Sequence, residues 1–80
     1  MGARFPTKTG KEMDRIIRKF CTLTHQKGSH RTFERDDGTG TPFTFSYHDG
    51  AIVPGGKVRR TLLNDVGLSI EQAEREVGMR

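Results

Sequence analysis

The pattern of apolar and polar residues changes from a helical period to a strand period near residue 21. Four apolar residues have the i, i+3, i+4 and i+7 spacing of a helical stripe, namely Met13, Ile16, Ile17 and Phe20. Thr9-Gly10-Lys11-Glu12 stands before the stripe and has the pattern of a capping box, in which the Thr9 hydroxyl accepts from the Glu12 amide and the Glu12 side chain reaches back. The sequence therefore predicts a helix that begins just after Thr9.

Alternation with a period of two predicts three strands after this helix. They cover residues 21–25, 30–35 and 43–47. Lys27-Gly28 and the cluster at residues 36–40 supply the turns, because their glycines accept positive φ. Short connections between consecutive strands favour an antiparallel meander with one buried face.

Turn residues at 48–50 and 54–56 are followed by two more predicted helices. The apolar stripe of the first of these helices consists of Val58, Leu62, Leu63 and Val66, and Gly67 suits the position just after its end. A second capping-box pattern at residues 69–72 begins a short helix, which carries on one side Ile70, Ala73 and Val77. The order helix, three strands, helix, short helix predicts an α+β sandwich, with the helices on one face of a three-stranded antiparallel sheet.

Size and composition narrow the class of protein. Eighty residues, of which 31% are hydrophobic, are expected to form a single domain with a small core. Residues 1–8 are polar and basic and are predicted to form a mobile tail, which leaves residues 9–80 as the domain. No apolar run is long enough to span a membrane, and the chain starts without the apolar segment of a signal peptide. The single Cys excludes an internal disulfide, so a reducing, cytoplasmic setting is expected. One Cys and three scattered His give no zinc-binding spacing, so no metal or other cofactor is expected.

Positive charge is concentrated in the first part of the chain. The whole chain has a net charge of +4. Residues 1–31 hold eight basic and two acidic side chains, a net charge of +6, whereas residues 32–50 hold one basic and four acidic, a net charge of −3. Such a distribution is typical of small proteins that bind polyanions such as RNA. The alternatives are a solvated basic face and a domain that binds other proteins only.

Strand alternation places two histidines on one face of the predicted sheet. If Phe33 points toward the helices, His30 faces the opposite, open side, and on the third strand His48 does the same. His30 begins its strand and His48 ends the next one, so antiparallel pairing is expected to bring them together. We expect the remaining histidine, His25, to be an ordinary surface residue.

Two histidines beside basic residues suit the cleavage of RNA without a metal. An imidazole can act as a general base on the 2′-hydroxyl or as a general acid on the leaving 5′-oxygen, because histidine titrates near neutral pH. Lys27 and Arg31, which are close to His30 in sequence, would hold the phosphate and stabilise its developing charge. Ser29 either hydrogen-bonds His30 or only shapes the turn. The alternative is that these histidines are surface or capping residues.

Residues 55–60, Gly-Gly-Lys-Val-Arg-Arg, form a second candidate site. A Gly-rich segment that enters a helix offers free amide groups to a phosphate, and Lys57, Arg59 and Arg60 add positive charge. The spacing of a P-loop is absent, and a flexible loop before a solvated helix is the alternative. Cys21 has no general base at a recognisable spacing, so we expect it to pack as a small apolar group.

Several segments within residues 9–77 together form a recognisable set. They are the basic first helix, Gln26-Lys27-Gly28-Ser29-His30, the hairpin that ends in Asp37-Gly38, His48 and Val66-Gly67-Leu68-Ser69. In these segments the chain resembles the HicA toxin family, the YcfA-like messenger-RNA interferases of bacterial toxin–antitoxin pairs. Gly28-Ser29-His30 is the most specific of these segments.

This resemblance implies a fold, an activity and a partner. The fold would be that of a double-stranded-RNA-binding domain, with α-β-β-β-α order. The activity would be metal-independent cleavage of messenger RNA that arrests translation, with His30 as the catalytic residue, and a HicB-type antitoxin would cover the active face. The alternative function is a double-stranded-RNA-binding module without catalysis, in which Lys57, Arg59 and Arg60 would contact the RNA.

Overall fold

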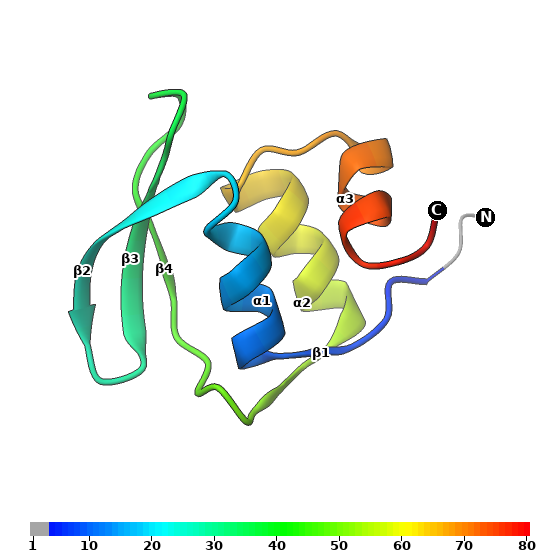
Figure 1. Ribbon diagram of the computed structural model, residues 1–80, viewed down its shortest axis with the longest axis horizontal. Coiled ribbons are helices and arrows are strands. Elements are labelled where there is room, and N and C mark those ends of the chain that lie inside the picture. The colour runs from blue at the N-terminus through cyan, green and yellow to red at the C-terminus, as the bar shows by residue number, and fades with distance from the viewer. Residues whose placement is uncertain (1–3) are drawn as a thin grey trace.

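The computed structural model describes residues 4–80, which form a small sheet with helices on one side of it (Figure 1). The strands of this sheet are β2 (Cys21–Lys27), β3 (His30–Arg35) and β4 (Phe43–Phe45). The helices are α1 (Gly10–Ile17), α2 (Gly55–Arg60), which runs directly into a π-helical segment (Thr61–Asp65), and α3 (Ile70–Glu76). Two short strands, β1 (Lys8–Thr9) and β5 (Ile52–Val53), pair with each other.

Helix α1 begins with the predicted capping box. The Thr9 amide donates to Glu12 Oε1 at 2.8 Å, and the Glu12 amide donates to Thr9 Oγ1 at 3.1 Å. These two bonds satisfy amide groups that have no partner within the helix. Three of the four stripe residues are buried, namely Met13, Ile16 and Ile17. Phe20 follows the end of the helix and is half-buried against the core.

The three-stranded sheet is the predicted antiparallel meander, in the order β2-β3-β4. The turn between β2 and β3 contains Gly28, whose φ of 60° lies in the left-handed region that suits glycine. Strand β4 ends at Phe45, two residues earlier than the sequence pattern predicts. The sheet therefore has the expected topology but a shorter third strand.

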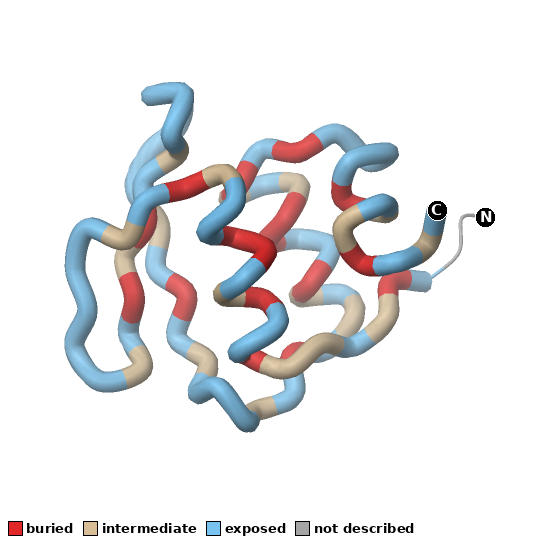
Figure 2. The backbone as a smooth tube through the Cα atoms, viewed as in Figure 1, coloured by how far each residue is buried: buried red, intermediate tan, exposed pale blue. Residues whose placement is uncertain are grey.

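One hydrophobic cluster joins the sheet to the helices. Phe33 and Phe45 face it from the sheet and are almost completely buried, whereas their strand neighbours Thr44 and Ser46 are exposed. Figure 2 shows buried residues along the helices and at individual positions of β3 and β4, with β2 mostly exposed. The structure thus confirms an α+β fold in which the helices cover one sheet face and leave the other open.

The second long helix widens in its last turn. The Val66 amide donates to the Thr61 carbonyl at 2.9 Å, which is a π-helical bond. Val58, Leu62 and Val66 are therefore buried at intervals of four, while Leu63 is only half-buried. Gly67 follows the helix with a φ of 84°, as predicted.

The packing of helix α3 differs from the prediction in one detail. The Ser69 hydroxyl accepts from the Gln72 amide at 3.1 Å, and Ala73 and Val77 are buried. Ile70, which the pattern places beside them, is 37% exposed. The reason is that Leu68, just before the helix, is buried in the core at this end of α3.

The N-terminal segment differs from the predicted mobile tail. Phe5 is buried in the core, and Lys8 pairs with Val53 in the two-stranded sheet. Gly55 lets the chain pass closely, because a Cβ at this position would collide with the carbonyl oxygen of Phe5. Residues 4–8 therefore lie against the body of the protein, held by one aromatic side chain and one strand pair; residues 1–3 lie outside the described part of the chain.

Candidate active site on the open face of the sheet

His30 lies at the start of β3, directly across from Ser46. Arg31 pairs with Phe45 in the register of β3 and β4, so the next residue on each strand meets its counterpart. The Ser46 hydroxyl and His30 Nδ1 are 3.2 Å apart and form a hydrogen bond. This bond orients the imidazole and leaves Nε2 as the ring nitrogen for reaction.

The open face around His30 is polar. Lys27 stands opposite His30 on β2, and the hydroxyls of Thr32 and Thr44 are 3.5 Å apart across β3 and β4. An antiparallel sheet with one buried face is expected to carry polar residues on the other. By register and burial, the side chains of this face are those of Thr22, His25, Lys27, His30, Thr32, Glu34, Thr44 and Ser46.

His48 does not occupy the position that the sequence predicts. Because β4 ends at Phe45, the chain leaves the sheet before it reaches His48 and crosses the start of α1. A Cβ on Gly10 would collide with the His48 carbonyl oxygen, and the Lys11 amide donates to the next carbonyl, that of Asp49, at 3.0 Å. Within residues 4–80 the hydrogen-bonding partner of His30 is Ser46, not His48.

Arg31 is a structural residue, contrary to the prediction that it contacts RNA. It is 8% exposed, and its Nη2 donates to Asp49 Oδ1 at 2.6 Å. Its Nη1 lies 3.2 Å from Asp14 Oδ1 of α1, and the hydrogen bond to Asp49 raises the pKa of the guanidinium. Arg31 shares the strand parity of Phe33 and so points toward the helices, away from His30.

The turn between β2 and β3 places Lys27 and Ser29 differently. Lys27 is exposed and lies across from His30. Ser29 is half-buried in the turn, which is braced by a 3.1 Å bond from Gln26 Nε2 to the Gly28 carbonyl. Of the two interpretations of Ser29, the structure favours a role in shaping the turn, since the hydroxyl that bonds His30 belongs to Ser46.

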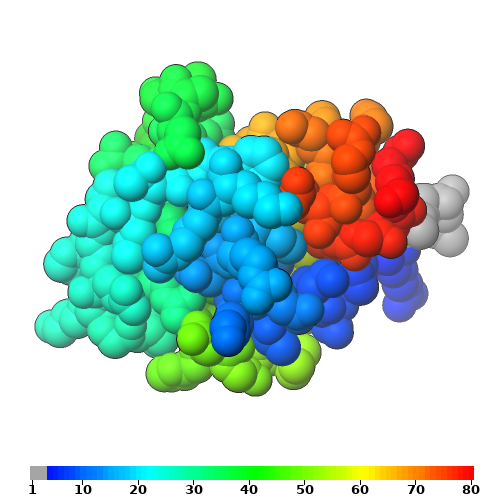
Figure 3. All heavy atoms as spheres, viewed as in Figure 1, coloured from blue at the N-terminus to red at the C-terminus, as the bar shows by residue number. Residues whose placement is uncertain are grey.

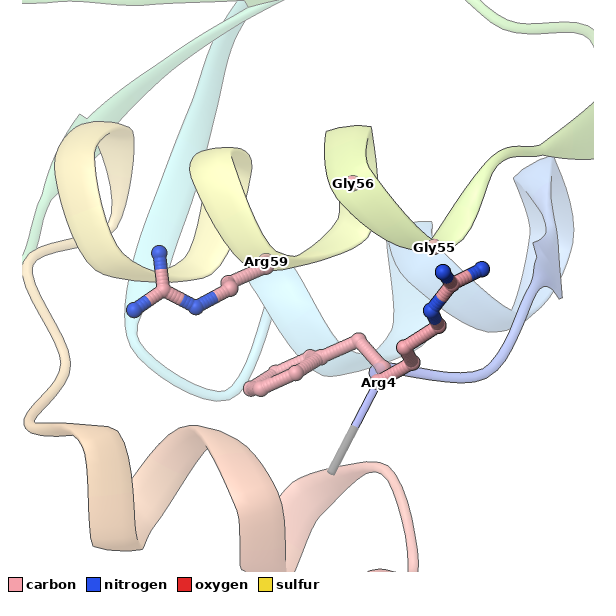
Figure 4. Close-up of a pocket in the computed structure, with 5 residues that line it drawn as sticks. Arg4, Gly55, Gly56 and Arg59 are labelled. Atoms are coloured by element: carbon pink, nitrogen blue, oxygen red, sulfur yellow. The ribbon is translucent and has the colours of Figure 1, made fainter. Parts of the chain in front are cut away.

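The second candidate site lines a separate hollow of about 460 Å³. Its walls are Arg4, Phe5, Gly55, Gly56 and Arg59, and Figure 4 shows the guanidinium groups of Arg4 and Arg59 at opposite ends of it. Arg59 and Arg60 are exposed and Lys57 is half-buried. Sequence reasoning missed Arg4, because the packing of the N-terminal segment against α2 carries no local signal.

The two candidate sites are not brought together. Helix α2 belongs to the layer that covers the buried sheet face, whereas His30 is on the open face. The hairpin of β2 and β3 forms one end of the molecule, and α3 and the C-terminus form the other (Figure 3). The basic residues of α2 therefore contribute to a different surface from that of His30.

Cys21 packs in the core, as expected from the sequence. It is 3% exposed, and burial raises the pKa of its thiol, with a further increase from the nearby carboxylate of Asp36. A buried thiol with a raised pKa is a poor nucleophile. This residue is therefore no candidate for covalent catalysis.

Across residues 4–80, no three His, Cys, Asp or Glu side chains gather closely enough to hold a metal ion. The same part of the chain contains no helix of the length and apolarity that crossing a membrane requires. No family model, curated protein or solved structure matches the chain.

Proposed function

We propose that this chain is a HicA-type toxin, a metal-independent endoribonuclease that cleaves messenger RNA and so arrests translation. The observation that carries the proposal is the 3.2 Å hydrogen bond that orients His30 on an exposed sheet face, with Lys27 across from it. The Gly28-Ser29-His30 segment by which the sequence resembles the family forms the turn and strand start that present this imidazole. The α-β-β-β-α part of the chain would accordingly be a double-stranded-RNA-binding-domain fold.

The chemistry is the attack of a ribose 2′-oxygen on the adjacent phosphorus. His30 takes the 2′-hydroxyl proton, the P–O2′ bond forms, and the P–O5′ bond breaks as the 5′-oxygen gains a proton. Lys27 stabilises the negative charge that develops on the phosphate oxygens. The products are a 2′,3′-cyclic phosphate and a free 5′-hydroxyl.

Binding and catalysis are expected to rest on different surfaces. Lys57, Arg59 and Arg60 lie on the helix layer, away from His30, and contact phosphates of the same RNA beyond the cleaved bond. A HicB-type antitoxin would cover the open face. Its surface is expected to be acidic, because opposite charges speed association with a basic partner. A toxin held in such a complex is expected to lose cleavage and to regain it when the antitoxin is removed.

The direct test is cleavage of a defined messenger RNA in EDTA by the parent and by His30→Ala. Cleavage by the parent alone is the expected result. Equal cleavage by both would assign the activity to another site or to a contaminant. If neither cuts and both bind RNA, the binding-module alternative would replace the enzyme.

A binding measurement separates RNA binding from the alternative of a domain that binds proteins only. Titration with RNA at two salt concentrations is expected to show affinity that falls as salt rises, because phosphate contacts release counterions. The triple variant Lys57→Ala, Arg59→Ala, Arg60→Ala should bind more weakly and with a flatter salt dependence. The absence of salt-sensitive RNA binding would leave standing the alternative of a domain that binds proteins only.

A further inference from the structure

The open face contains a second histidine, His25, because β2 has a β-bulge. In the register of β2 and β3, Leu23 lies opposite Phe33, but the next pair joins His25 to Thr32, so Thr24 is an extra residue. A bulge of this kind shifts the alternation of every later residue on its strand. Without it, His25 would share the parity of Cys21 and Leu23 and would face the helices.

The bulge brings His25 next to His30. After the shift, His25 pairs with Thr32 and Lys27 pairs with His30, and directly paired residues share a sheet face. His25 and His30 are therefore diagonal neighbours, whose Cα atoms are typically about 7–8 Å apart. From backbone positions this close, two imidazoles on the same face can hydrogen-bond opposite sides of one phosphate group, at about 2.8 Å each.

We propose that His25 is the general acid of the site, the group that protonates the leaving 5′-oxygen while His30 acts as the base. This inference rests on the proposed function and assigns its missing proton donor. As the P–O2′ bond forms, His30 holds the proton of the 2′-hydroxyl; as the P–O5′ bond breaks, protonated His25 gives its proton to the 5′-oxygen. The two protons balance, and no metal or other reactant is needed.

The base role proposed for His30 requires the tautomer that is protonated at Nδ1. In this tautomer Nδ1–H donates to the Ser46 hydroxyl, and Nε2 carries the lone pair that accepts a proton. His25 is exposed, and none of the hydrogen bonds described for residues 4–80 involves its ring, so either nitrogen can hold and release a proton. Lys27, which lies directly across from His30 and two residues after His25 on the same face, neutralises the phosphate that they flank.

Two substrates distinguish a general acid from a residue that only supports the fold. One is an RNA with the normal 5′-oxygen at the cleavage site, and the other has a bridging sulfur there. A thiolate leaves without gaining a proton, so the sulfur substrate needs no acid. His25→Ala is expected to cleave the oxygen substrate about 10²- to 10⁴-fold more slowly than the parent and the sulfur substrate at close to the parent rate.

Matched variants make the outcome specific. His25→Gln keeps a polar side chain that cannot donate an acidic proton, and it should behave as His25→Ala does. His48→Ala, at the exposed histidine that has left the sheet, should match the parent on both substrates. His30→Ala should be slow on both, because the base is needed whichever atom leaves.

The failure of this inference differs from the failure of the proposed function. If the parent cuts, and His25→Ala cuts the oxygen substrate equally fast or loses both substrates to the same degree, His25 is not the acid although the ribonuclease stands. If the parent cuts neither substrate while still binding RNA, the proposed function fails, and the role of His25 fails with it. Circular dichroism and urea midpoints of the variants should equal those of the parent, since His25 is exposed.

Discussion

Arg31 and Asp49 are joined by a 2.6 Å hydrogen bond that ties β3 to the chain segment after β4. The bond to the Arg31 guanidinium is the main cause that lowers the pKa of Asp49 below its ordinary value. Hydrogen bonds to Thr9 and to Thr39 lower the pKa values of Glu12 and Asp37 in the same direction. The folded protein therefore keeps these three carboxylates charged at a pH where the unfolded chain takes up protons.

The free energy of unfolding is therefore expected to fall as the pH drops below about 4 and continues through the lowered pKa values of these carboxylates. A depressed pKa in the folded state contributes stability that is fully present above the unfolded value and is lost in acid. Asp49→Asn should lower the urea midpoint at pH 7 and flatten its decline between pH 5 and pH 3. Glu34→Gln, which removes an exposed carboxylate from the open face, is the control. Parallel pH curves for the parent and Asp49→Asn would contradict this role for the Arg31 bond.

Ser46 is expected to be a positioning residue for His30. Ser46→Ala removes the hydroxyl that orients the ring and should lower kcat by roughly 10- to 100-fold with little change in KM. Ser46→Thr, which keeps a hydroxyl, should restore most of the rate. Thr44→Ala is the matched control, because Thr44 lies on the same face two residues before Ser46 and contacts Thr32 rather than His30. A similar loss in Thr44→Ala and Ser46→Ala would indicate a general effect on β4.

Gly67 and Gly78 have the same φ of 84° but different surroundings. A Cβ on Gly67 would lie 2.8 Å from Arg35 Cζ, whereas one on Gly78 would have no neighbour within 4 Å. Alanine at either position should cost roughly 1–2 kcal/mol for the left-handed backbone. Gly67→Ala should cost about 1 kcal/mol more, because Arg35 would lose hydrogen bonds to the main chain of the preceding helix. Equal urea midpoints for the two variants would contradict that contribution of Arg35.

Arg35 closes the C-terminal end of the second long helix. Its Nε donates to the Asp65 carbonyl at 2.9 Å and its Nη2 to the Asn64 carbonyl at 3.0 Å. These carbonyls have no amide partner further along the helix, and a cation at this end also suits the helix dipole. The expected result for Arg35→Gln is therefore a loss of stability of the same order as the additional cost in Gly67→Ala.

Cys21 should react slowly with iodoacetamide in the folded protein at pH 8. It is 3% exposed, and burial raises the pKa of its thiol, so little thiolate is accessible. In urea the same thiol should be alkylated at the rate of a free cysteine, as mass spectrometry would show. Fast alkylation without denaturant would mean that the end of α1 and the start of β2 open readily.

The predictable parts of the fold are those set by local periodicity. The stripe of α1, the Thr9 cap, the three strands and the Gly67 terminus all follow from spacing and residue type within a few positions. The pairing of β1 with β5 joins residues more than forty positions apart in segments of two residues, too short to show a period. The burial of Phe5 depends on the same long-range contact.

The candidate site was predictable only where the alternation is regular. His30 lies on the open face, as the alternation of β3 predicts, because the register of β3 with β4 has no bulge. The sequence pattern predicts no special place for His25, because composition and spacing do not reveal the single extra residue of a bulge. The nearness of Arg31 to His30 in sequence predicts an RNA contact, whereas its shared parity with Phe33 indicates the buried side, which is where the structure places it.

The positions of the two chain ends decide how the protein can be labelled and shortened. The segment that leads into β1 and the C-terminal end after α3 lie toward the end of the molecule remote from the β2–β3 hairpin (Figure 1). An affinity tag or a fluorophore at either end therefore leaves the hairpin surface accessible to a ligand. Trimming the chain is a different matter, because removal of residues 4–9 would take away Phe5 and the whole of β1. A protein shortened in this way would therefore lack the two-stranded sheet of β1 and β5.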